Sequence, residues 1–230
     1  MSVTSETVGG VLWDLDGTLI DSAGHHWIAW RDTLAAEGRS VQPPDFVNSF
    51  GKRNDEILRE LFGTHLAPEW IERVSEAKER TYRRLLREGG LAPLPGAIEW
   101  LGRLQRAGWR QALASSAPRP NIDAVFEVLG LGRFLDALVS ADEVGRGKPD
   151  PAVFLEAARR LGLPPVRCVV VEDAPAGLEA ARRAGMPAIG VLSSHHPSLE
   201  ADLVVPSLDA LPLGAFETLL CTTRAKRGSI

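Results

Sequence analysis

Five short runs of apolar residues constrain the fold of this chain more than any other feature of its sequence. They span residues 10–13, 111–114, 137–139, 168–171 and 188–191. The runs are apolar throughout rather than alternating, which is typical of strands that are covered on both faces of a sheet. Between them apolar residues recur at helical spacing, as in Ala97, Trp100, Leu101 and Leu104. This alternation predicts βαβ units and therefore an α/β fold with a parallel sheet.

The interval between the first and second runs is too long for a simple crossover and contains no convincing strand. Its pattern predicts helices, with Pro43-Pro44 and Gly63 as breaks, over residues 26–37, 55–62 and 68–87. A chain of 230 residues is long enough for one domain with an insertion. We therefore expect a small helical domain of residues 22–95, inserted into a core domain of residues 1–21 and 96–230.

The overall charge and the apolar pattern exclude several classes of partner. A formal net charge of -4 gives no electrostatic reason to expect nucleic acid or an anionic membrane. No apolar run reaches the length of a membrane span, and the first ten residues lack the features of a signal peptide. Cys168 and Cys221 are far apart and form no metal-binding or disulfide pattern. We expect a cytoplasmic monomer whose basic tail, from Cys221 onward, is frayed.

Polar side chains follow four of the apolar runs at the point where each run ends. They are Asp14 and Asp16 after the first run, Ser115 and Ser116 after the second, Lys148 after the third and a short loop, and Glu172 and Asp173 after the fourth. Ligands of parallel α/β sheets bind at the carboxyl ends of the strands. We therefore expect these side chains to converge on one rim of the sheet.

Four carboxylates on one rim repel each other and need cations nearby. Two unit charges ~4 Å apart cost about 4 kcal/mol at an effective dielectric constant of ~20. Lys148 alone cannot offset this repulsion, but Lys148 together with a divalent cation can. Because no His/Cys set accompanies the carboxylates, their oxygens predict Mg²⁺ rather than zinc. A magnesium site with few protein ligands is typical where the substrate supplies phosphate oxygens.

Four motifs resemble those of the haloacid dehalogenase superfamily, in the order in which that family carries them. They are "DLDGTLIDS" at residues 14–22, Ser115 in "LASS", Lys148 in "GKPDP", and Glu172-Asp173 in "VVEDAPAGLEAA". The resemblance covers residues 8–205 and points to the branch of phosphatases and phosphomutases with a helical cap after the first strand. It implies a Rossmann-like parallel sheet core with an inserted helical cap domain.

The resemblance also implies roles for the residues on the rim. Asp14 is similar to the family's nucleophile, which attacks phosphorus and forms an aspartyl-phosphate. Asp16 is similar to the general acid/base, and its backbone carbonyl would face the metal. Lys148 would neutralise charge on the nucleophile and the transferring group. A capped turn is the alternative interpretation of the two aspartates.

The remaining rim residues would hold the phosphoryl group and the metal. Ser115 matches the motif position for a phosphoryl oxygen, with Ser116 as the alternative or an additional ligand. Glu172 and Asp173, with Asp14 and Asp16, would bind Mg²⁺. Glu172-Asp173 also precedes a helix that starts near Pro175, so capping of that helix is a second possible role.

A loop of the insertion would set the specificity for the substrate. In this part of the family a cap loop reaches the active site, and here that loop is residues 49–58. Gly51 permits a tight turn, and Lys52, Arg53 and Asn54 are candidates to contact an anionic or hydroxylated substrate. Ordinary solvated side chains are the alternative interpretation.

The choice of reaction depends on the residues after the motif serine. His26 and Trp30 fall where the β-phosphoglucomutase-like branch carries a His and a Trp, so His26 is a further candidate for substrate binding. Those mutases hold a second phosphate with a Ser and a Lys at the positions of Ala117 and Pro118, which offer neither hydroxyl nor charge. We therefore predict a Mg²⁺-dependent phosphatase of a small phosphorylated metabolite such as a sugar phosphate. A phosphomutase, with Arg119 as the compensating anchor, is the alternative, and a non-catalytic binding protein is a remote one.

Overall fold

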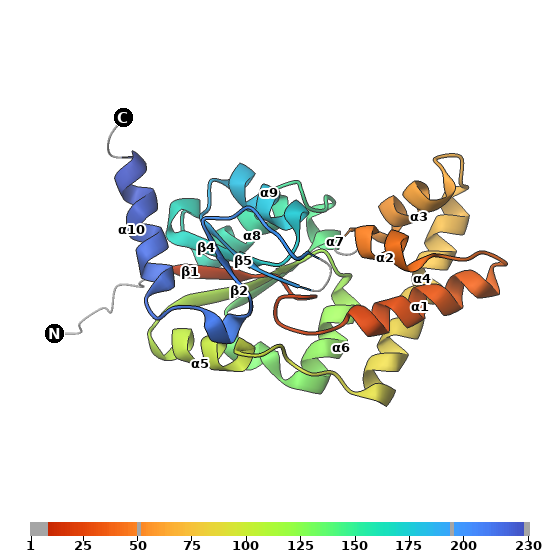
Figure 1. The fold of residues 1–230 in the computed structure, drawn as a ribbon, viewed down its shortest axis with the longest axis horizontal. Helices are drawn as coiled ribbons and strands as arrows, with labels where there is room; N and C mark the ends of the chain where they lie inside the picture. The colour runs from red at the N-terminus through yellow and green to blue at the C-terminus, as the bar shows by residue number, and fades with distance from the viewer. Residues whose placement is uncertain (1–8, 50–51, 194–195, 228–230) are drawn as a thin grey trace.

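In the part of the chain that the structure describes, one parallel sheet of six strands forms the centre of the molecule (Figure 1). The computed structural model describes residues 9–49, 52–193 and 196–227. The strands lie in the order β3-β2-β1-β4-β5-β6, and every neighbouring pair is parallel. Their bounds are β1 Gly10–Trp13, β2 Arg110–Ser115, β3 Ala137–Ser140, β4 Cys168–Glu172, β5 Ala188–Val191 and β6 Leu203–Val205. The predicted α/β fold with a Rossmann-like parallel sheet is confirmed.

The sequence analysis did not predict strand β6. Strand β6 has three residues, pairs with β5 alone, and leaves Val204 37% exposed at the edge of the sheet. The five predicted strands are each covered on both faces and are therefore apolar throughout. An edge strand of this length carries too few apolar residues to stand out from a loop.

Helices cover both faces of the sheet, and the alternating side chains of the central strands are buried in two separate clusters. In β1, Val11 and Trp13 belong to the cluster with α5 and α10, whereas Leu12 belongs to the cluster with α8 and α9. This division follows from the alternation of side chains along a strand. The helices of the core are α5 Ala97–Arg106, α6 Arg119–Leu129, α7 Ala141–Val144, α8 Ala152–Leu161, α9 Pro175–Ala184 and α10 Ala215–Arg227.

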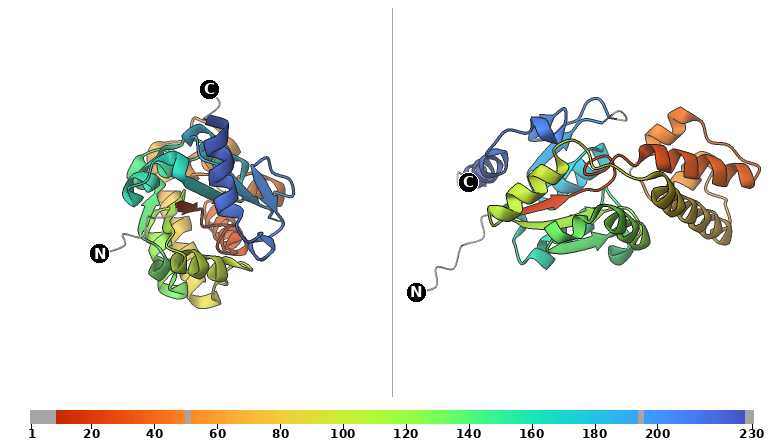
Figure 2. Two further views of the ribbon diagram at one scale, coloured as in Figure 1. Left: turned by 90° about the vertical axis from the view of Figure 1, so that its left-hand side faces the viewer. Right: turned by 90° about the horizontal axis from the view of Figure 1, so that it is seen from below.

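Of the five helices that the structure describes between β1 and β2, the first four form a lobe beyond the carboxyl ends of the strands, which we call the cap (Figures 1 and 2). They are α1 Ala23–Ala36, α2 Pro43–Ser49, α3 Asn54–Phe62 and α4 Pro68–Gly89. The cap has its own buried cluster, which includes Trp30, Leu34 and Leu58. Two chain segments connect it to the sheet, and the N–H of Leu94 donates to the carbonyl of Leu19 between them at 2.9 Å. The residue ranges that we assign to the two domains stay a prediction.

Helix α4 belongs to both lobes. Its first half places Ile71 and Val74 in the cluster of the cap, whereas Tyr82 and Leu86 in its second half lie in the core cluster that includes α5 and α10. The helix therefore contributes side chains to both hydrophobic clusters.

One helix was not predicted, and one prediction about local structure was wrong. Pro43 and Pro44 lie between the predicted helices, but they also begin α2, because the first helical positions require no N–H donor. The tail is not frayed from Cys221, because α10 continues to Arg227 after anchoring Phe216 and Leu220 in the core. Within the described ranges, no helix combines the length and apolar composition that a membrane crossing requires.

Candidate active site

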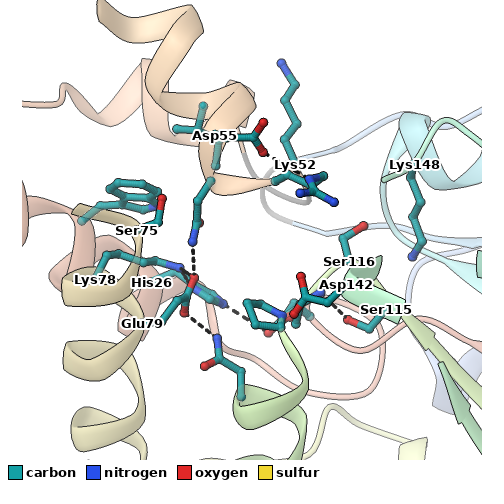
Figure 3. Close-up of a pocket in the computed structure, with 18 of the residues that line it drawn as sticks. His26, Lys52, Asp55, Ser75, Lys78, Glu79, Ser115, Ser116, Asp142 and Lys148 are labelled. Carbon is teal, nitrogen blue, oxygen red and sulfur yellow. Dashed lines mark hydrogen bonds and ion pairs between the residues drawn. The ribbon is translucent and has the colours of Figure 1, made fainter. Parts of the chain in front are cut away.

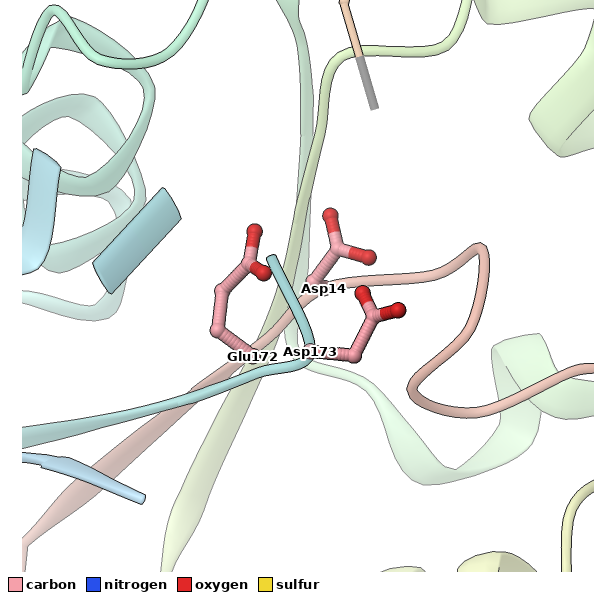
Figure 4. A group of neighbouring side chains, drawn as sticks. All are labelled: Asp14, Glu172 and Asp173. Atoms are coloured by element: carbon pink, nitrogen blue, oxygen red, sulfur yellow. The ribbon is translucent and has the colours of Figure 1, made fainter. Parts of the chain in front are cut away.

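Three carboxylates meet where β1 and β4 end side by side (Figure 4). The backbone N–H of Asp14 donates to the carbonyl of Val171 at 3.0 Å, so Asp14 lies next to Glu172. Asp14, Glu172 and Asp173 are buried, and each places one oxygen within 4.8 Å of the others. The strand register thus brings together side chains that are about 160 positions apart in the sequence.

Lys148 is the cation among these carboxylates. Its ammonium donates to Asp14 Oδ1 and, at 2.7 Å, to Glu172 Oε1, and the lysine is itself 4% exposed. Burial and the charge of Glu172 raise the pKa of Asp14 despite the opposing charge of Lys148. Burial, Glu172 and Asp14 likewise raise the pKa of Asp173. One lysine therefore does not offset the negative charge of this cluster.

The cluster fits a hard divalent cation. All three side chains offer oxygen, and Asp173 Oδ2 is buried without a hydrogen-bond partner among the described residues. Two glycines allow the carboxylates of Asp173 and Glu172 to lie close to the backbone. A Cβ on Gly17, whose φ is +87°, would lie 2.2 Å from Asp173 Oδ2, and one on Gly177 would lie 1.8 Å from Glu172 Oε1.

Glu172 also supports the helix that follows it. Its Oε2 accepts the backbone N–H of Ala174 at 2.7 Å, just before α9 begins at Pro175. The same carboxylate faces Lys148 through Oε1. The two interpretations of this residue, a contact at the start of a helix and a place in the acidic cluster, are therefore compatible.

Asp16 lies apart from the acidic cluster and faces the cap. Its Oδ1 accepts the hydroxyl of Ser22 and lies 3.4 Å from both His26 Nε2 and the Tyr82 hydroxyl. Burial raises the pKa of Asp16, but the hydrogen bond and charge of His26 and the hydroxyl of Ser22 outweigh it and hold the pKa below its usual value. The two aspartates of the first motif thus have different surroundings.

His26 connects Asp16 to the middle of the last cap helix. Its ring stacks on Tyr82 with centroids 4.0 Å apart, and its Nδ1 lies 2.9 Å from Lys78 Nζ. Lys78, which is 2% exposed, also contacts the carboxylate of Glu79 at 2.8 Å.

The two serines after β2 differ in their contacts. Ser115 Oγ accepts the backbone N–H of Ala117 at 3.0 Å. The hydroxyl proton of Ser115 takes no part in this hydrogen bond. Ser116 Oγ is buried and has no hydrogen-bond partner in the described part of the chain. Both serines line the same cavity, so the geometry is compatible with either as a ligand for an anion.

A cavity of about 770 Å³ lies between the rim of the sheet and the cap (Figure 3). Asp14, Asp16 and Lys148 line it from the core, and Lys52, Arg53 and Asn54 line it from the cap. This volume is typical of a site that holds a small organic molecule.

Each cap residue predicted to contact substrate has a protein partner in this structure. Lys52 pairs with Glu60 at 2.7 Å, Arg53 pairs with Asp55 at 3.1 Å, and Asn54 donates to Glu79 at 2.6 Å. Gly51 lies outside the described residues. The side chain of Arg53 also packs against the core, because a Cβ on Gly147 would lie 2.9 Å from Arg53 Cδ.

The sequence analysis missed several residues around Asp16 and the cavity. Ser22 stands within the quoted first motif and could have been found there. Tyr82, Glu79 and Asn121 carry no motif, and their positions follow from contacts between α4, Asp16 and α6 that the order of residues along the chain does not reveal.

Comparisons with known proteins agree with this geometry. The model of the haloacid dehalogenase-like hydrolase family matches residues 8–185. Hexitol phosphatase A of Escherichia coli (strain K12) is 35% identical over 206 residues, which cover 88% of this chain and 92% of that protein. The β-phosphoglucomutase of Bacillus subtilis (strain 168) is 33% identical over 216 residues, covering 88% and 91%. The crystal structure of CbbY from Rhodobacter sphaeroides in complex with phosphate has a TM-score of 0.84 and 28% identity, covering 91% and 99%.

Proposed function

Because the chain belongs to the haloacid dehalogenase-like hydrolase family, we propose that it is a Mg²⁺-dependent phosphatase of a small phosphorylated sugar or polyol. The observation that carries the proposal is the position of Asp14. Its carboxylate is buried beside Lys148, Glu172 and Asp173 at the floor of a cavity that the cap covers. The relatives named as a hexitol phosphatase and a β-phosphoglucomutase support the chemical class of the substrate.

In the proposed reaction, Asp14 attacks the phosphorus atom of the ester. The bond between phosphorus and the leaving oxygen breaks as the new bond to the carboxylate forms, which yields an aspartyl-phosphate. Asp16, which must carry a proton once the anionic ester is bound, donates this proton to the leaving oxygen. Water then attacks the phosphorus atom, Asp16 takes a proton from this water, and the bond to Asp14 breaks. Phosphate leaves and both aspartates return to their starting states.

The other residues of the rim would stabilise the charge of the transferring group. Lys148, fixed between Asp14 and Glu172, neutralises the carboxylates as phosphate approaches. Ser115 or Ser116 donates its hydroxyl to a phosphoryl oxygen. Asp14, Glu172 and Asp173, with the backbone carbonyl of Asp16, would hold Mg²⁺. When bound, the ion supplies electrostatic stabilisation to the phosphoryl oxygens.

Hydrolysis is favoured over the transfer of phosphate within a bisphosphate. A mutase must hold two phosphates at once, and Ala117 and Pro118 provide no anchor for the second. Arg119, the compensating residue that a mutase would need, pairs with Asp123 at 2.8 Å and is absent from the described lining of the cavity. Intact carboxylates, lysine and serines at the rim favour an enzyme over a non-catalytic binding protein.

A panel of phosphate esters tests the proposal. The purified protein is incubated with hexitol phosphates, hexose phosphates, and β-glucose 1-phosphate with a bisphosphate primer, each with Mg²⁺ or EDTA. Release of inorganic phosphate that requires Mg²⁺, without an isomerised sugar phosphate, is the expected result. Isomer in excess of phosphate would establish a mutase. Activity in EDTA equal to that in Mg²⁺ would remove the metal from the proposal.

A further inference from the structure

A buried carboxylate in the middle of α4 has no part in the reaction proposed above. Glu79 lines the cavity, is 6% exposed, and makes no contact with Asp14 or Asp16 that the structure records. Figure 3 shows it beside His26 and Lys78, on the cap side of the cavity and away from Ser115 and Lys148. A buried charge of this kind is costly unless it is hydrogen-bonded. The hydrogen-bond partners of Glu79 therefore indicate its role.

The two oxygens of Glu79 serve different lobes of the molecule. Its Oε1 accepts Asn54 Nδ2 at 2.6 Å and Lys78 Nζ at 2.8 Å, and both donors belong to the cap. Its Oε2 accepts Asn121 Nδ2 at 2.5 Å, and Asn121 lies in the first half of α6 in the core. The oxygen of the Asn121 amide accepts Arg83 Nη1 at 2.8 Å, which fixes the orientation of that amide.

The elements that meet at Glu79 both face the substrate cavity. Asn54 is the first residue of α3 and follows Lys52 and Arg53 in the predicted specificity loop. Asn121 lies in α6, which follows Ser115 at the end of β2 and the short loop that carries Ser116. Glu79 itself lies on α4 between Val74, in the cluster of the cap, and Tyr82, in the core cluster. One carboxylate thus connects the substrate-facing part of the cap to the element behind the phosphoryl-binding loop.

We propose that Glu79 is a positioning residue for substrate recognition: by bridging Asn54 and Asn121, it fixes the start of α3 over the cavity and so sets the affinity for the organic part of the substrate. The inference rests on the proposed function, because it assigns a role within the same site. The bridge requires a carboxylate that accepts on both oxygens. Burial raises the pKa of Glu79, but the charge and hydrogen bond of Lys78 and the hydrogen bond of Asn121 outweigh it and lower the pKa to about 2. The acceptor therefore remains ionised at neutral pH.

The test exchanges the carboxylate of Glu79 and the amide of Asn121 between the two positions. In Glu79→Gln, the amide oxygen still accepts Asn54 and Lys78, but the amide nitrogen meets the nitrogen of Asn121. In Asn121→Asp, two carboxylates face each other. In the double variant, the amide on α4 donates to the carboxylate on α6, and that carboxylate still accepts Arg83. The bridge is thereby restored with its polarity reversed.

We expect each single variant to raise the KM for the best sugar or polyol phosphate about tenfold, since a buried donor or acceptor is left unpaired. The kcat should change less than about twofold, and the double variant should recover most of the loss. The KM for p-nitrophenyl phosphate should stay within about twofold of wild type, because its leaving group offers no hydroxyls to the cap. Glu88→Gln is the matched control, since Glu88 lies on the same helix, pairs with Arg84 at 3.0 Å and is 58% exposed.

Equal losses on both substrates, or a double variant no better than the single ones, would overturn the inference and leave Glu79 a structural residue. A second readout separates this outcome from failure of the proposed function. Hydrogen–deuterium exchange over residues 54–58 and 119–125 should be faster in Glu79→Gln and return to wild-type rates in the double variant. If the wild type hydrolyses no ester, the proposed function fails, and exchange alone decides the bridge. Unchanged exchange in Glu79→Gln would then refute it.

Discussion

Individual carboxylates at the ends of β1 and β4 have different neighbours, and this difference separates their proposed roles. Asp14 is held by Lys148 and lies in the acidic cluster. Asp16, two residues later, is held by Ser22 and approached by His26 and Tyr82. In the proposed reaction, Asp14 would therefore face the phosphoryl group, whereas Asp16 faces the cap, where the leaving group would lie.

Asp14→Asn should reduce kcat for phosphate release at least about a thousandfold, because the amide cannot act as the nucleophile. The fold should persist, since Lys148 keeps Glu172 as a partner. Phosphate release and circular dichroism measure the two effects. Substantial Mg²⁺-dependent turnover in this variant would remove Asp14 as the nucleophile.

Asp173→Asn should raise the Tm in EDTA and also raise the Mg²⁺ requirement for activity. A substitution that only destabilises the fold would instead lower the Tm. The substitution removes one of three clustered charges, so in EDTA the Tm should rise about 2–4 °C for each ~1 kcal/mol of repulsion relieved. The Mg²⁺ concentration for half-maximal activity should increase at least about tenfold. Thermal melts in EDTA and Mg²⁺, with an activity titration, measure both effects. An unchanged titration would contradict the proposed metal site.

At the scale of elements, β1 joins the site to the core through Trp13, which faces away from the carboxylates. The indole donates to Gln111 Oε1 at 3.0 Å, and the amide of Gln111 donates in turn to the carbonyl of Leu101 at 2.9 Å. The ring also packs edge-on against Phe216 with centroids 6.2 Å apart. This buried network ties two central strands to α5.

Trp13→Phe should lower the free energy of unfolding by about 1–3 kcal/mol, because Gln111 Oε1 loses its donor. The KM and kcat should stay near wild type, since the side chain lies in the core cluster. Urea unfolding measures the loss. Trp109→Phe is the matched control: its indole N–H is buried without a hydrogen-bond partner among the described residues, so this substitution should cost less. Equal losses would show that packing, not the hydrogen bond, dominates.

The elements also show what could be predicted from the sequence. The central strands β1 and β4 were predicted because their runs at residues 10–13 and 168–171 are apolar throughout. Asp14 after β1, Glu172 at the end of β4 and Lys148 in the loop after β3 stand in recognisable motifs, and the structure brings them together. Strand β6 was missed because a short edge strand has no such signature, and α2 because two prolines also begin helices. The contact between Glu79 and Asn121 joins residues 42 positions apart without a local pattern. Contacts of this kind depend on how two helices pack, which periodicity does not encode.

At the scale of the whole molecule, the cap touches the core on two sides of the cavity. On one side α4 packs against α6, with Arg87 and Glu127 3.2 Å apart at the surface. On the other side the stem of Arg53 lies against Gly147, one residue before Lys148. The second contact brings a cap side chain next to the loop that carries Lys148, whose ammonium lies between Asp14 and Glu172.

Arg53→Ala should alter the ranking of substrates more than it alters turnover of p-nitrophenyl phosphate. We expect the KM for sugar or polyol phosphates to rise about three- to tenfold, which corresponds to the loss of ~1 kcal/mol of contact. Steady-state kinetics on both substrates provide the measurement. Equal losses on both would remove Arg53 as a specificity residue.

Gly147→Ala tests the same contact from the core. The added Cβ would meet Arg53 Cδ at 2.9 Å and Cγ at 3.0 Å, so the side chain of Arg53 must move. This variant should resemble Arg53→Ala in its KM values. In the Arg53→Ala background the same substitution should add little, because the side chain that it displaces is already absent. Additive losses would show that Gly147 acts independently of Arg53.

The division of α4 between two hydrophobic clusters has a consequence for protein engineering. Tyr82 and Leu86 complete the core, whereas Ile71 and Val74 complete the cap. A chimera that imports the whole insertion of a relative would also replace part of the host's own interior. Grafts of substrate specificity should therefore exchange residues 23–74 except Ala29, which also lies in the core cluster, and retain the host sequence from Tyr82 onward, so that the core keeps its own packing.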